Sequence, residues 1–140
     1  MTQEQKELLL KDISARLPYK VCAQIPDKYG GYTSTIESID IDGFVKDFEG
    51  TLIEIKNIKP YLLPLSSMTE EQWMDTPYAN LNKFTFDSFK CGCSTLAFET
   101  YEVNLNYVVE FINWCYKNHF DINGLIPMGL ALKAPDGMYN

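Results

Sequence analysis

Four cysteines and one histidine are the residues of this chain most suited to covalent or metal chemistry. Cys115 and His119 are four residues apart, so a helix would place them on one face, where a thiolate and an imidazole can act together as a nucleophile. The same face would carry Val108 and Ile112, which indicates that it turns toward the core. A cysteine in such a position is usually a small apolar filler. We therefore expect both residues to be structural, with His119 close to the helix C-terminus, where donor groups meet free carbonyls.

Together with Cys91 and Cys93, this pair would supply three sulfur atoms and one nitrogen, a ligand set that structural zinc uses. The spacing is unfavourable, because Gly92 alone separates two cysteines that would normally be two to four residues apart in such a site. It also departs from the C-x-x-C pattern of redox proteins. We expect reduced thiols in a glycine turn. The alternative is a small enzyme or zinc-binding protein that uses Cys91, Cys93, Cys115 and His119.

The stretch "SIDIDGFVKDFE", which begins at Ser38, resembles a calcium-binding loop. Asp40, Asp42, Gly43 and Glu49 occupy the third, fifth, sixth and twelfth positions of that pattern. The first position, however, holds a serine, which is a weak ligand, and both flanks read as extended chain where an EF-hand needs helices. We expect instead a β-hairpin that turns at Asp42 and Gly43.

Acidic residues are concentrated in this region, since residues 37–54 contain six carboxylates and one lysine. A solvated face is the simplest interpretation. The functional interpretation is a surface that docks on a basic protein, because clustered charge accelerates the encounter with an opposite patch. The candidate protein-binding residues are Glu37, Asp40, Asp42, Asp47, Glu49 and Glu54.

The overall charge of the chain disfavours nucleic acid and anionic lipid as partners. The chain has 12 basic and 19 acidic residues and a net charge of −7, which opposes binding to phosphate backbones and to anionic lipid. It shows no phosphate-binding glycine loop, no nucleophile-elbow serine and no H-E-x-x-H motif, although a carboxylate pair formed in space remains open. No segment has the apolar core of a signal peptide or the ~18 to 20 apolar residues of a membrane span. We expect a cytoplasmic protein without a cofactor, which binds neither nucleic acid nor membrane but an unknown protein, as a monomer or a homodimer.

The first half of the chain predicts one helix and several strands. Thr2 and Gln5 form a capping box that opens a helix over residues 3–16. Apolar residues then alternate with polar ones from Tyr19 to Ile25, as in a half-buried strand. Further strands are expected in the β-branched stretch and its hairpin partners, at residues 32–41, 44–48 and 51–56. The prolines of residues 59–65 argue against a helix and against a central strand, and predict an extended segment that crosses the core.

The second half predicts helices. A second capping box, Thr69 with Gln72, opens a short helix that ends before Pro77, and the apolar period of residues 104–119 predicts a core helix. The end of the chain reads as a turn and a short apolar helix that ends near Lys133, whereas residues 78–102 yield no clear prediction. We predict a single α+β domain, residues 1–140, in which an antiparallel meander of three to four strands packs against the N-terminal helix and the core helix.

Three phrases carry a resemblance to a known family: "QKELLLKDISARLPY" (5–19), "KPYLLPLSSMTEEQ" (59–72) and "NHFDINGLIPMGLAL" (118–132). They resemble an uncharacterised family of small proteins encoded by Bacteroides-type gut bacteria and their prophages. The resemblance implies a bacterial or phage cytoplasmic setting and an accessory role, such as binding a host or phage protein. It implies no activity and no binding residue. The negative charge, the nine tyrosines and the absence of a credible catalytic set lead us to predict a non-catalytic protein-interaction module.

Overall fold

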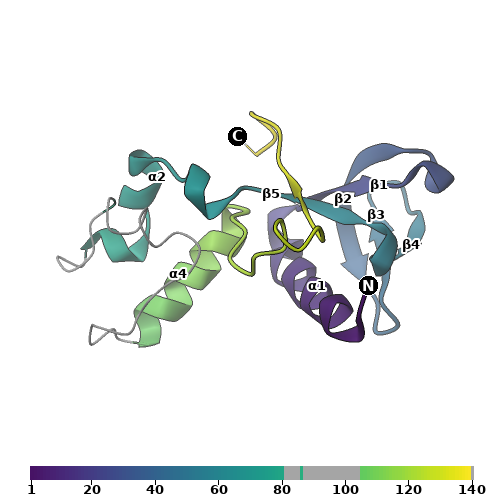
Figure 1. Ribbon diagram of the computed structural model, residues 1–140, viewed down its shortest axis with the longest axis horizontal. Helices are drawn as coiled ribbons and strands as arrows, with labels where there is room; N and C mark the ends of the chain where they lie inside the picture. The colour runs from purple at the N-terminus through teal and green to yellow at the C-terminus, as the bar shows by residue number, and fades with distance from the viewer. Residues whose placement is uncertain (81–85, 87–104, 140) are drawn as a thin grey trace.

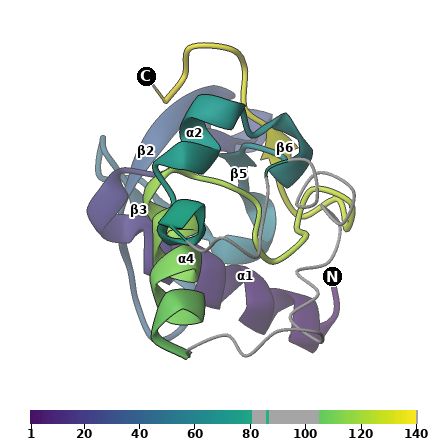
Figure 2. The ribbon, with the colours of Figure 1, turned by 90° about the vertical axis from the view of Figure 1, so that its left-hand side faces the viewer.

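The computed structural model describes residues 1–80, Phe86 and residues 105–139 of the 140-residue chain. The chain forms a six-stranded sheet with the strand order β4-β3-β2-β1-β5-β6. Strands β1 to β5 are labelled in Figure 1 and β6 in Figure 2. The strands are β1 (Cys22–Ile25), β2 (Tyr32–Ile39), β3 (Phe44–Asp47), β4 (Leu52–Glu54), β5 (Lys59–Leu62) and β6 (Leu132–Lys133). All neighbouring strands are antiparallel except β5 and β6, which run parallel. The predicted α+β class is confirmed.

Helix α1 (Gln3–Arg16) covers the inner face of the sheet and has the predicted bounds. Thr2 and Gln5 form the predicted capping box, which satisfies backbone N–H groups that the first turn leaves free. Leu9 and Ile13, four residues apart on the helix, are fully buried in the main core. The strands contribute alternate residues to this core, as period-two patterning requires. These include Val21, Ala23 and Ile25 at β1, and Ile36, Val45 and Ile53 from the neighbouring strands.

The sheet is larger than the predicted three to four strands, and the prediction that residues 59–65 form no central strand is wrong. Residues 59–62 form β5, in which Pro60 lies opposite Ala23 of β1. Proline is tolerated here because β6 pairs only with Tyr61 and Leu62. No residue of β6 lies opposite Pro60, so no bond to β6 is lost through the N–H that proline lacks. The parallel pairing of β6 also means that the sheet is more than a meander.

A second, aromatic core lies beside the sheet, where Figure 1 shows α2 and α4. Helix α2 (Glu70–Met74) begins at the predicted capping box of Thr69 and Gln72. The residues that flank this cap, Met68 and Trp73, are both buried in the aromatic core. Helix α4 (Leu105–Lys117) contributes Phe111, whose ring centroid lies 4.8 Å from that of Tyr78. In the part of the chain that the structure describes, no helix combines the length and apolar character needed to cross a bilayer.

The predicted short helix that ends near Lys133 is wrong. Residues 121–131 form turns, and residues 132–133 form β6. The carboxylate of Asp121 accepts the backbone N–H groups of Leu125 at 2.7 Å and of Ile126 at 2.9 Å. Leu130 in turn donates its N–H to the carbonyl oxygen of Leu125 at 2.9 Å. These amides are therefore committed to a side chain and to a turn instead of an i→i−4 ladder.

Candidate functional site

His119 terminates α4 and lies outside it, so the predicted shared helical face with Cys115 is wrong. The helix ends at Lys117, two residues before His119. The backbone N–H of His119 donates to the carbonyl of Tyr116 at 3.2 Å, and that of Phe120 donates to the carbonyl of Cys115 at 2.9 Å. This pair of bonds is the Schellman arrangement, which places one residue in the left-handed conformation. His119 has that conformation, with φ +63°, so it does not continue the helical row of Cys115.

The imidazole of His119 is enclosed and neutral. His119 is 5% exposed, and its ring stacks on the ring of Tyr139 with the two centroids 3.8 Å apart. Burial, reinforced by the positive charge of Arg16, lowers the pKa of His119 to about 4, against opposing contributions from a hydrogen bond with the Tyr19 backbone and from Asp12. Among the described residues, Nδ1 has no hydrogen-bond partner. This ring is placed to fill the interior and not to receive a substrate proton.

Cys115 is equally unsuited to nucleophilic chemistry. Its side chain is fully buried, and burial raises the pKa of the thiol to about 12, so the reactive thiolate is scarce at neutral pH. Cys91 and Cys93 lie outside the described residues. Within residues 1–80, 86 and 105–139, no three His, Cys, Asp or Glu side chains are arranged to hold a metal ion.

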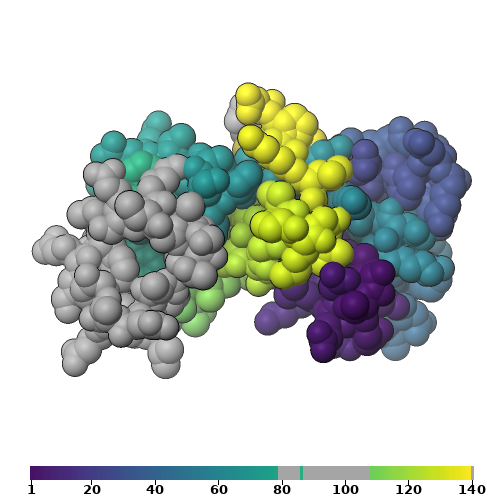
Figure 3. Space-filling model, in the orientation of Figure 1, coloured from purple at the N-terminus to yellow at the C-terminus, as the bar shows by residue number. Residues whose placement is uncertain are grey.

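A fully buried ion pair, which the sequence analysis missed, joins α1 to the end of α4. Arg16 Nε donates to Asp12 Oδ1 at 2.6 Å, and Arg16 Nη2 donates to the carbonyl of Phe120 at 2.7 Å. The amide of Asn123 donates to Asp12 Oδ2 at 2.8 Å, which ties the following loop to the same carboxylate. Figure 3 shows the yellow-green residues of this loop against the purple N-terminal helix. The four-residue spacing of Asp12 and Arg16, on a helix that also carries the apolar Ile13, is the feature of the sequence that could have predicted this pair. The pair is closed to solvent and structural.

Tyr139 fastens the end of the described chain to the sheet. Its hydroxyl accepts the backbone N–H of Cys22 at 3.0 Å and donates to the carbonyl of Tyr61 at 2.7 Å. The hydroxyl thus bridges β1 and β5 just beyond the last residues that pair between them, Ala23 and Pro60. The ring at the same time covers His119.

Replacing Tyr139 by phenylalanine should therefore lower the free energy of unfolding by about 1 to 3 kcal/mol, because two partly buried backbone groups lose their partner while the stacked ring remains. Urea unfolding measures the loss, and hydrogen exchange should be faster at the Cys22 amide. Tyr19→Phe, which removes a hydroxyl from an exposed residue, is the matched control and should change stability by less than about 0.5 kcal/mol. Equal stability of the two variants would contradict the bridging role.

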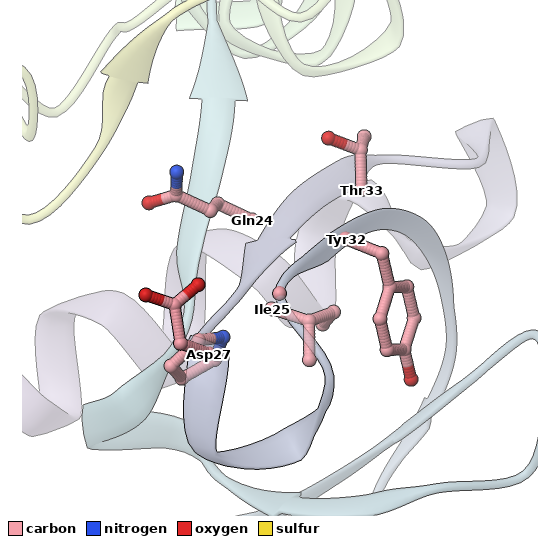
Figure 4. A pocket seen from close by; sticks show the side chains of 7 residues that line it. Gln24, Ile25, Asp27, Tyr32 and Thr33 are labelled. Atoms are coloured by element: carbon pink, nitrogen blue, oxygen red, sulfur yellow. The ribbon is translucent and has the colours of Figure 1, made fainter.

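A depression of about 530 Å³ lies at the turn between β1 and β2 (Figure 4). Figure 4 shows the side chains of Gln24 and Asp27 on one side of it and the ring of Tyr32 on the other. Asp27 is the only carboxylate among its lining residues. The hydroxyl of Tyr32 is committed to the carboxylate of Asp47. The depression therefore lacks a pair of groups that could share acid and base roles.

The acidic segment forms the predicted hairpin, but two of its six carboxylates build its turns. Gly43 has φ +81°, and Asp40 accepts the N–H groups of Asp42 and Phe44, each at 2.9 Å. Asp47 is fully buried and accepts the N–H groups of Glu49 and Thr51 at 3.0 and 2.8 Å. The predicted turn at Asp42 and Gly43 is confirmed. Asp40 and Asp47 are occupied within the fold.

The remaining carboxylates are available at the surface. Glu37, Asp42 and Glu49 are exposed, and no ion pair is formed by them within the described residues. Glu54 lies 2.8 Å from Lys56, in a pair whose two side chains are 44% and 56% exposed. Such an exposed pair contributes little to stability, so its carboxylate can be shared with an incoming cation.

Apolar side chains that the sequence analysis did not single out lie among these carboxylates. Phe48 is 73% exposed and Leu52 is 61% exposed. Opposite residues share a face of the sheet, and the pairing of Phe44 with Glu54 and of Lys46 with Leu52 places these four side chains on the outer face. Next to them is a depression of about 580 Å³, whose lining includes Glu37, Lys46, Phe48 and Glu49. We name as the hairpin face Glu37, Phe44, Lys46, Phe48, Glu49, Leu52 and Glu54.

The hairpin face is the strongest candidate site in the part of the chain that the structure describes. It combines exposed aromatic and aliphatic groups with carboxylates, whereas the groups capable of chemistry at Cys115 and His119 are enclosed. Comparison with protein-family models, curated protein sequences and solved structures finds no match for this chain.

Proposed function

We propose that this chain is a non-catalytic protein-interaction module that binds a basic partner protein through the hairpin face. The observation that carries the proposal is the exposure of Phe48 and Leu52, 73% and 61%, beside the free carboxylates of Glu37 and Glu49. Exposed apolar groups with a polar rim are typical of protein-binding surfaces, in which aromatic residues are enriched.

Charge favours a basic partner. Lys46 is the only cation of the hairpin face, and the whole chain carries a net charge of −7. A surface of this kind attracts a positively charged protein over distances of about 10 Å at moderate salt and repels nucleic acid and anionic membranes. Contacts of this type at the rim act mainly on the association rate and are weakened by salt.

The setting that fits this proposal is the cytoplasm of a bacterium or of a bacterial cell infected by a phage. The resemblance of residues 5–19, 59–72 and 118–132 to proteins of gut bacteria and prophages supports an accessory role, in which the chain binds a host or phage protein. The enclosed positions of Cys115 and His119 favour this role over catalysis by a thiol–imidazole pair.

Affinity capture from the native cell tests the proposal. The wild-type chain should retain one stoichiometric partner that salt releases, and Phe48→Ser or the pair Glu37→Lys and Glu49→Lys should weaken the binding of that partner at least about tenfold, which is about 1.4 kcal/mol. Binding of the purified partner, measured by calorimetry at two salt concentrations, then gives the affinities.

Matched controls are available elsewhere on the surface. Met128→Ser removes an exposed apolar side chain, 49% exposed, and Glu110→Lys reverses an exposed charge on α4. Both should retain the partner at the wild-type level. Repeated captures without a stoichiometric partner, or equal retention by the hairpin and control variants, would remove the basis of the proposal.

A further inference from the structure

The outer edge of β4 has backbone groups that no other strand in the described residues uses, because β4 is the last strand of the sheet. The ladder with β3 fixes which groups these are. Ile55 donates its N–H to the carbonyl of Gly43 at 2.9 Å, and Asp47 donates to the carbonyl of Thr51 at 3.1 Å. In an antiparallel ladder alternate residues bond to the same neighbour. The backbone groups of Leu52 and Glu54 therefore point away from β3.

The opposite edge of the sheet differs. Strand β6 has only two residues, one of them Lys133, and Pro135 follows two residues after it. Proline and charged side chains on an edge strand hinder the addition of another strand. Residues 52–54 include no proline and one charged side chain, Glu54, whose negative charge favours a basic segment over other segments. The β4 edge is thus the one that another chain can extend.

We propose that the outer edge of β4 receives an extended segment of the basic partner as an added strand. This inference rests on the proposed function and specifies its binding mode. Main-chain hydrogen bonds to Leu52 and Glu54 would supply affinity, and alternate side chains would supply specificity. On the outer face, an apolar side chain of the segment lies beside Leu52 and a lysine or arginine beside Glu54. The recognised segment therefore carries an apolar and a basic residue two positions apart.

Charge complementarity selects this occupant over a second copy of the chain. Pairing of two β4 edges would bring together two segments that each carry six carboxylates and one lysine over residues 37–54. Like charges across neighbouring strands oppose pairing. A cationic segment is attracted instead, because Glu49 precedes β4 and Glu54 is its last residue.

A seven-residue peptide of sequence Lys-Thr-Val-Thr-Lys-Thr-Val, blocked at both ends, is a suitable probe because lysine and valine share one face of its strand. Titration followed by amide NMR should shift the signals of Leu52 and Glu54 and slow their hydrogen exchange. The key comparison is Leu52→Pro with Leu52→Thr. Both remove the leucine side chain, but only proline removes the outward N–H, and it leaves the ladder with β3 intact. Leu52→Pro should bind the peptide at least about tenfold more weakly than Leu52→Thr.

Two N-methylated peptides sharpen the test, one methylated at the threonine amides and the other at the lysine and valine amides. Since one set of amides faces β4, one peptide should lose binding and the other keep it. Equal binding by Leu52→Pro and Leu52→Thr, or no change at the Leu52 and Glu54 amides, overturns strand addition. A dimer of the free chain, detected by sedimentation and lost in Leu52→Pro, overturns the basic occupant in favour of a second copy.

These outcomes are separable from a failure of the proposed function. If Phe48→Ser releases the captured cellular partner while Leu52→Pro and Leu52→Thr hold it equally, the docking face stands and strand addition is wrong. If neither Phe48→Ser nor Leu52→Pro affects the partner, the proposed function itself is wrong.

Discussion

Replacing Asp12 by leucine is expected to lower the free energy of unfolding by about 3 to 5 kcal/mol, because the charge of Arg16 is then buried without its counterion. Both side chains of this pair are 0% exposed, so water cannot take the place of the carboxylate. A domain of this size is stable by about 5 to 15 kcal/mol, so the variant loses a large part of its margin. Urea unfolding at pH 7, followed by circular dichroism, measures the change.

The double variant Asp12→Leu and Arg16→Met should be more stable than the single variant, because no charge is left buried. It should not reach the wild type, since the carbonyl of Phe120 and the amide of Asn123 both lose a partner. Lys11→Met, at an exposed position of the same helix, should change stability by less than about 0.5 kcal/mol. If the double variant is as unstable as Asp12→Leu, Asp12 does not stabilise the fold through its ion pair with Arg16.

Stability should also fall as the pH drops below neutral, because His119 is held neutral in the fold. Its pKa is lowered to about 4 by burial and then by Arg16, against an ordinary value of 6.5. The unfolded chain therefore binds a proton that the folded chain does not. The contribution of the neutral ring is complete above pH 6.5 and is lost between pH 6.5 and about 4, with a slope of at most about 1.4 kcal/mol per pH unit. We expect a loss of about 1.5 kcal/mol from pH 6.5 to 5.

His119→Asn isolates this effect, because asparagine tolerates the left-handed conformation at the helix end and does not titrate. It should be less stable than the wild type at pH 7.5, since the ring that stacks on Tyr139 is gone. Its stability should nevertheless be nearly constant from pH 6.5 to 5. His119 is the only histidine of the chain, so few other groups titrate in this window. Parallel pH profiles of the two proteins, measured by urea unfolding, would refute the assignment.

The sequence determined those elements whose causes are local. The capping boxes of Thr2 with Gln5 and of Thr69 with Gln72 join residues three positions apart, so the starts of α1 and α2 were predictable. The inner face of β1 followed from the alternation of apolar residues. The hairpin turn at Gly43 followed from the residue types that accept a positive φ.

The sequence could not show which segments, distant along the chain, pair or contact each other in the fold. Strand β5 was missed because Pro60 argues against a strand unless the register of β1 and β6 is known. The apolar period suggested a final helix, and the carboxylate of Asp121 prevented it by binding the amides of Leu125 and Ile126. Strand pairing and side-chain capture depend on which segments meet in space, and hydrophobic period alone does not specify that.

The candidate site shows the same division. Composition placed six carboxylates in residues 37–54 and identified them as one acidic surface. The fold separated Asp47, which is buried and binds the β3–β4 turn, from Glu37 and Glu49, which face solvent beside Phe48. The sequence contains a single imidazole, that of His119, whereas burial in the fold and then the charge of Arg16 lower its pKa and keep it neutral. Residue type sets what a group can do, but exposure and neighbouring charge, which only the tertiary structure supplies, decide whether it can do so.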